Sequence, residues 1–162
     1  MNEPVLSMNR EQLLACIFVG FGAGQTPSLP SECKTSPDCL EETSGLWSKS
    51  WDDINLSQFD EKTWLYTSVP PKYIAPFLGC YMHKSIYFGQ FDHRSFDSLL
   101  EGGDHLSKYK KYATPNLSIL RISLSSRQLL IFREYILYRA EKVGMTERSS
   151  LLAMAKALSS SI

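Results

Sequence analysis

A cysteine, two histidines and an aspartate lie close together in the middle of the chain and could carry out covalent chemistry. They are Cys80, His83, Asp92 and His93. A cysteine attacks as its thiolate, which a nearby imidazolium stabilises, and an acidic side chain orients the histidine. The sequence therefore allows a cysteine- and histidine-dependent hydrolase or transferase centred on Cys80. Alternatively, Cys80 packs as a small hydrophobic side chain, so whether the chain is an enzyme stays open.

Cysteine and histidine are also the commonest ligands of zinc, and the chain contains one set that could bind it. Cys33, Cys39, Cys80 and His83 supply three sulfur ligands and one nitrogen ligand, which suits a tetrahedral site. The spacing of Cys80 and His83 is typical of a ligand pair, whereas that of Cys33 and Cys39 is wider than usual. Zinc is accordingly the one cofactor that the sequence suggests, and the alternative is that these cysteines bind no metal.

Positive charge is concentrated in the last third of the chain. Residues 1–105 contain 7 Lys and Arg against 14 Asp and Glu, whereas residues 106–162 contain 10 against 3. Within the basic part, Lys108, Lys110 and Lys111 alternate with two tyrosines, a pattern that can contact phosphates and stack on bases. Nucleic-acid or anion binding is therefore one hypothesis. The other is that oppositely charged parts of the chain attract each other in the fold.

Aromatic residues are concentrated in the middle of the chain. Twelve of the 19 lie in the segment 47–96, including Trp47, Trp51 and Trp64. Aromatic side chains build hydrophobic cores, and they also carry much of the energy of protein interfaces. These three tryptophans are therefore candidate binding residues.

The clearest helix signal covers residues 126–143. Ser125 and Gln128 form a capping box, and Gly144 follows the helix. Apolar residues occupy two sides of this helix, and Tyr138 lies on the second side, so both sides must be covered. The final helix, which begins near Thr146, or a partner would provide that cover.

The remaining elements predict an α+β fold, with a small, mostly antiparallel sheet packed against helices and two C-terminal helices. Residues 9–19 are predicted as a helix, and the alternative is a short strand over the β-prone residues Cys16–Val19. Trp64–Val69, Ser85–Phe88 and residues 117–124 are predicted as strands, because they are β-prone or alternate between apolar and polar residues. Pro76 is expected to interrupt any helix before the second strand.

The composition suits one globular unit. The chain has 162 residues, of which 43% are hydrophobic and 21% charged, and this excludes disordered, collagen-like and disulfide-dense classes. We expect a helix or arm over residues 1–24, a Pro/Ser-rich loop over 25–50 and a single α+β domain over 51–162. The longest apolar run, residues 13–24, is shorter than the roughly 20 residues that cross a bilayer. A cytoplasmic location is predicted, with secretion as the alternative.

Together these features favour a small soluble protein-binding or regulatory domain. It would act through its aromatic-rich surface and the apolar face of the helix 126–143, with a protein partner or by self-association. The alternatives are the enzyme centred on Cys80 and nucleic-acid or anion binding by the basic third.

Overall fold

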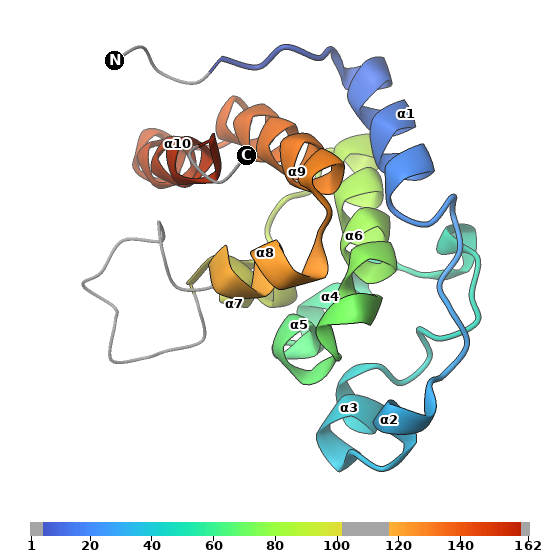
Figure 1. Cartoon of the computed structure of the whole chain (residues 1–162). Helices are drawn as coiled ribbons and strands as arrows, with labels where there is room; N and C mark the ends of the chain where they lie inside the picture. The colour runs from blue at the N-terminus through green and yellow to red at the C-terminus, as the bar shows by residue number, and fades with distance from the viewer. Residues whose placement is uncertain (1–4, 102–116, 160–162) are drawn as a thin grey trace.

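The computed structural model describes residues 5–101 and 117–159, and every regular element in these two ranges is a helix (Figure 1). The only extended pairing among them is an isolated antiparallel bridge between Gln25 and Ser50. The α-helices are α1 (Arg10–Gly20), α2 (Ser31–Lys34), α3 (Pro37–Glu42), α4 (Leu56–Glu61), α5 (Leu65–Ser68), α6 (Ile74–Phe88), α7 (Arg94–Glu101), α8 (Leu117–Ser123), α9 (Ser126–Ala140) and α10 (Met145–Ser159). Two 3₁₀ turns, η1 (Trp51–Asp53) and η2 (Pro71–Tyr73), complete the set.

The α+β prediction is therefore wrong, and the segment 117–124 shows why. An alternating pattern predicts that Leu120, Ile122 and Leu124 face the same way. In the structure Leu120 is 1% exposed and Leu124 is 5% exposed, whereas Ile122 is 69% exposed. Burial at every fourth residue is the period of a helix, and this segment forms α8. Over eight residues, the apolar positions of a strand and those of a helix overlap, so the sequence did not distinguish the two.

The other two predicted strands are also helical. Ser85–Phe88 is the last turn of α6, and most of Trp64–Val69 is the short helix α5. Pro76 does not interrupt α6, because it lies in the first turn, where a backbone N–H has no partner within the helix. The β-prone residues of both segments are overridden by burial of one helical face.

Three helices of the structure match helices predicted from the sequence. Residues 9–19 were predicted as a helix, and α1 begins after Asn9, which forms a capping box with Gln12. The capping box of Ser125 and Gln128 starts α9, and α10 follows as the final helix. Gly144 differs from expectation, since its backbone does not adopt the left-handed conformation.

The helix α9 is the centre of the packing. It lies between α1 and α10, and α1 also packs against α6 (Figure 1). Ten of the 15 residues of α9 are buried, including Phe132, Tyr135 and Ile136, whereas Leu130 is 44% exposed. Both apolar sides of this helix are thus largely covered within the chain.

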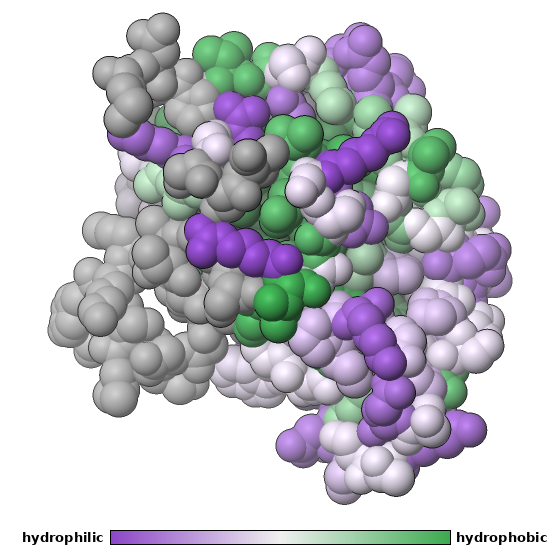
Figure 2. Space-filling view, viewed as in Figure 1, coloured by the Kyte–Doolittle hydropathy of each residue, from purple (hydrophilic) through white to green (hydrophobic). Residues whose placement is uncertain are grey.

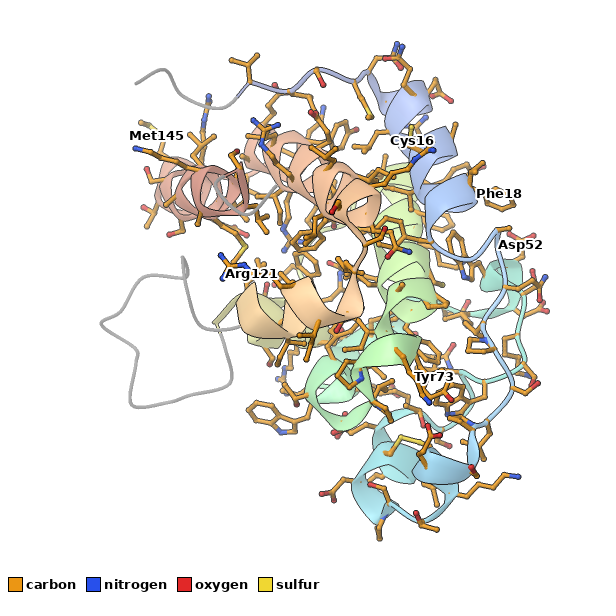
Figure 3. The ribbon with its side chains drawn as sticks, viewed as in Figure 1. Cys16, Phe18, Asp52, Tyr73, Arg121 and Met145 are labelled. Carbon is orange, nitrogen blue, oxygen red and sulfur yellow. A yellow bond between two sulfur atoms is a disulfide. The ribbon has the colours of Figure 1, made fainter. Side chains whose placement is uncertain are left out.

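The segment 25–50 is compact. It contains α2 and α3, which a disulfide between Cys33 and Cys39 joins (Figure 3, yellow bond). The Thr26 hydroxyl donates to the carbonyl oxygen of Leu46 at 2.6 Å and accepts from the N–H of Lys49 at 2.9 Å, which closes the segment at its base. The predicted loop is thus partly helical, while the division into three units stays a prediction.

None of the described helices combines the length and the apolar composition that crossing a membrane requires.

Candidate partner-binding site

A surface hollow of about 520 Å³ lies where the carboxyl ends of α6 and α9 meet the beginning of α1. In Figure 1 the beginning of α1 and the end of α6 lie at the same, upper end of the molecule. The described residues that line the hollow are Arg10, Ile86, Tyr87, Phe88, Gly89, Phe91, Tyr138 and Lys142. We call it the Tyr87–Phe88 cleft. Its lining combines aromatic rings with cations.

Two consecutive aromatic side chains at the end of α6 project from the surface at this cleft. Tyr87 is 59% exposed and Phe88 is 57% exposed, and their rings meet edge to face with centroids 5.1 Å apart. The helix stops directly after them, because Gly89 adopts a left-handed conformation with φ 65°. The two rings are therefore presented by the end of a stable 15-residue helix.

Cations lie on the aromatic rings around the cleft. The Arg10 guanidinium is 5.9 Å from the Tyr87 ring centroid, and the Lys142 ammonium is 5.1 Å from that of Tyr138. Outside the lining, the Lys84 ammonium lies 5.9 Å from the Phe88 ring. Such contacts hold a positive charge against an aromatic face. The rings and the charges thus form one surface.

The Arg10 side chain also connects two of the helices at the cleft. Its Nη2 donates to the carbonyl oxygen of Tyr87 at 3.4 Å, and its Nη1 contacts the Glu11 carboxylate at 2.5 Å. Because Tyr87 lies in the last turn of α6, the guanidinium satisfies an acceptor that the helix leaves free. Arg10 therefore helps to fix α1 against the end of α6.

Cys80, the proposed nucleophile, is completely buried in α6. Burial raises the pKa of its thiol to about 12, an effect that the Asp52 carboxylate adds to and the Lys84 ammonium opposes. A thiol with such a pKa stays protonated near neutral pH and is a poor nucleophile. None of the hydrogen bonds seen in the described part of the chain joins Cys80 to a histidine.

The two candidate histidines lie in different environments. His83 is half-buried on α6, beside the rings of Phe18 and Trp51 at centroid distances of 6.1 and 5.8 Å. His93 is buried, and its Nδ1 lies 3.1 Å from the Tyr81 hydroxyl. Asp92 is exposed and lines a different hollow from the one described above. Within the described residues, the structure shows no hydrogen bond that joins any two of the side chains of Cys80, His83, Asp92 and His93.

The four proposed zinc ligands are divided in the structure. Cys33 and Cys39 form the disulfide, so neither offers a thiolate to a metal, whereas Cys80 and His83 lie on α6. Over residues 5–101 and 117–159, no group of three or more Cys, His, Asp or Glu side chains is arranged to hold a metal ion.

The predicted tryptophans are mostly structural. Trp51 is buried, and the Trp47 ring meets Phe77 edge to face at 4.8 Å while its Nε1 donates to the Thr43 hydroxyl at 2.7 Å. Trp64 is partly exposed, away from the residues that line the Tyr87–Phe88 cleft. Of the predicted binding residues that the structure describes, Tyr138 is the one that lines the cleft.

Lys108, Lys110 and Lys111 lie outside the described residues. On the visible face in Figure 2, hydrophobic residues form patches between hydrophilic side chains.

A buried arginine was missed by sequence reasoning. Arg139 is 1% exposed, and its Nη1 donates to the hydroxyls of Tyr81 at 3.0 Å and Tyr135 at 3.4 Å. Its Nη2 donates to the carbonyl oxygen of Phe91 and to Asp97 Oδ1 at 3.4 Å. The one available signal was an arginine four residues after a tyrosine on an otherwise buried helix. Arg139 connects α9 to α6 and α7 and is a structural residue.

No family model, curated protein or solved structure matches this chain.

Proposed function

We propose that this protein is a binding module that recognises a partner protein through the Tyr87–Phe88 cleft. The observation that carries the proposal is the pair of consecutive, more than half-exposed aromatic side chains beside a hollow of about 520 Å³. Aromatic and arginine side chains dominate the energy of protein interfaces when a partner removes them from water. This location refines the aromatic surface expected from the sequence.

The other parts of the sequence-based hypothesis receive less support. The apolar sides of α9 are largely covered by α1 and α10, and Leu130 is the one exposed large apolar side chain of that helix. The enzyme hypothesis is weakened by the burial of Cys80 and by the raised pKa of its thiol. Binding of a partner at the end of α6 requires neither an exposed apolar face on α9 nor a reactive Cys80.

Cell location also remains open to test. The sequence predicts the cytoplasm, whereas a disulfide such as Cys33–Cys39 is typical of an oxidising compartment. Because both cysteines are buried, quenching the cells with acid and alkylating the denatured protein before purification distinguishes the two. Alkylation of Cys33 and Cys39 indicates a reducing compartment, and their protection indicates an oxidising one.

Comparison of alanine variants tests the proposed function. Tagged wild-type protein, the double variant Tyr87→Ala with Phe88→Ala, and the control Trp64→Ala are isolated from the cells that produce the chain. Because truncating two central aromatic residues removes a large part of an interface's energy, we expect the double variant alone to lose a co-purifying protein. An identical set of co-purifying proteins from all three contradicts the proposal, provided that circular dichroism shows all three folded.

A further inference from the structure

The charges around the Tyr87–Phe88 cleft indicate what kind of partner segment it accepts. Arg10 and Lys142 line the hollow, Lys84 lies beside it, and none of the described lining residues is acidic. The chain as a whole has 17 basic and 17 acidic residues, so this imbalance is local. A surface of this kind complements a negatively charged segment and repels a positively charged one.

The neighbouring negative groups offset only part of this charge. Glu11 pairs with Arg10, but Glu11 lies outside the lining of the cleft. Both side chains are exposed, so the attraction between them is weak. The last carbonyl groups of α6 also attract cations, and the Tyr87 carbonyl accepts from Arg10. Each guanidinium or ammonium group has several N–H donors, so these bonds leave donors for a ligand.

The aromatic rings of the cleft indicate that its ligand also carries an apolar group. Tyr87 and Phe88 expose apolar area that a purely charged ligand would leave in water, and Ile86 and Phe91 extend the apolar lining into the hollow. The volume of about 520 Å³ lies within the usual range for a ligand pocket. A bulky apolar side chain would bury this area.

Building on the proposed function, we infer that the cleft binds an acidic peptide segment of the partner that also carries an aromatic or branched apolar side chain. The carboxylates of the segment contact Arg10 and Lys142, while its apolar side chain packs against Tyr87 and Phe88.

Fluorescence anisotropy with two labelled peptides tests this inference. One peptide has glutamates around a central tryptophan, and the other has glutamine in place of each glutamate. We expect the acidic peptide to bind about fivefold more tightly for each cation that it contacts, and to weaken as salt rises from about 0.05 M to about 0.3 M. The glutamine peptide should show little dependence on salt.

Charge variants assign the effect to named residues. Arg10→Gln and Lys142→Gln should each reduce the preference for the acidic peptide about fivefold, and the double variant should remove it. Lys156→Gln, which changes an exposed cation of α10, should keep the preference. Arg10→Gln also removes the hydrogen bond to Tyr87 and could disturb the fold. Lys142→Gln removes no such bond and therefore tests the charge effect by itself.

The outcomes separate this inference from the proposed function. Equal affinities for the two peptides, or binding of neither, overturn the inference. If Tyr87→Ala weakens both peptides equally while charge has no effect, the cleft still binds partners and the three cations serve only to stabilise helix ends. If Tyr87→Ala changes the binding of neither peptide, the proposed function fails as well.

Discussion

Gly79 sets how closely α1 approaches α6. A Cβ atom added at this position would collide with the Cβ of Phe21, which caps α1, and would lie 3.0 Å from Cη2 of Trp51. Both neighbours are buried, so neither has free space into which to move. The absence of a side chain at this residue is therefore a requirement of the packing.

Substitution of Gly79 by alanine measures how much stability is lost when a side chain is added at this contact. We expect Gly79→Ala to lower the free energy of unfolding by about 2 kcal/mol, because the extra methyl group overpacks the contact between α1 and α6. Gly144→Ala is the matched control, since no atom lies within 4 Å of its added Cβ. Urea denaturation compares the two variants. Equal stability of Gly79→Ala and Gly144→Ala would show that the α1–α6 contact is looser than described.

His93 makes the stability of the protein depend on pH. Because Arg139 donates to the Tyr81 hydroxyl, that hydroxyl can donate its own hydrogen to Nδ1 of His93, which requires neutral His93. Burial lowers the pKa of His93, and the Arg139 guanidinium adds to this effect while the Asp60 and Asp92 carboxylates oppose it. The pKa is thus lower in the folded than in the unfolded protein.

The sign of the pH effect follows from this shift. The contribution of His93 is complete above the unfolded pKa of about 6.5 and is lost as the pH falls through the lower folded value. His83, whose pKa burial also lowers, contributes with the same sign. We therefore expect acidification below about pH 6.5 to destabilise the wild type more than His93→Gln. Parallel stability curves for the two proteins, measured by urea denaturation from neutral to acidic pH, would exclude this role.

At the scale of elements, Gln128 connects two helices. Its Oε1 accepts the N–H of Ser125 at 2.9 Å to complete the capping box of α9, and its Nε2 donates to the carbonyl oxygen of Gly20 at 2.9 Å. Gly20 is the last residue of α1, so one side chain satisfies polar groups at the start of one helix and the end of another.

Two alanine variants separate these roles. Gln128→Ala loses both hydrogen bonds, and we expect a loss of about 2 kcal/mol in the free energy of unfolding. Ser125→Ala removes the cap while leaving the bond from Gln128 to Gly20, and it should cost about 1 kcal/mol. Thermal or urea unfolding of both variants tests the difference. A Gln128→Ala variant no less stable than Ser125→Ala would argue against the connection to α1.

Two of the helices that the sequence predicted correctly begin with a capping box. The capping boxes of Asn9 with Gln12 and Ser125 with Gln128 locate the starts of α1 and α9, because a cap depends on residues adjacent in sequence. The segment 117–124 has a short apolar pattern that fits two periods. Burial of Leu120 and Leu124 against distant residues selects the helix, and that choice is not encoded locally.

The candidate site was less predictable than the helices. Tyr138 was singled out for its position on α9, but the exposure of Tyr87 and Phe88 depends on where α6 ends relative to α1 and α9. The predicted strand over Ser85–Phe88 would have placed these two side chains on opposite faces of a sheet. The buried Arg139 was likewise hidden, because its partners come from α6 and α7.

At the scale of the whole molecule, ten large hydrophobic side chains of the described residues stay exposed, and Tyr87 and Phe88 are two of them. Two thirds of the residues of α9 are buried, and both halves of the sequence contribute to the core. The Cys33–Cys39 disulfide holds a peripheral segment. The Tyr87–Phe88 cleft is the place where exposed rings, cations and a hollow coincide among the described residues. Partner binding at this end of the molecule is therefore the central claim.

Photo-crosslinking in cells tests that claim most directly. A benzoylphenylalanine residue is placed at Phe88, and, as the control, at Trp64, a partly exposed aromatic residue away from the cleft. The account predicts a covalent adduct with a second protein from position 88, absent from position 64 and reduced by Tyr87→Ala. Adducts of equal yield from both positions, or none from position 88, would contradict it.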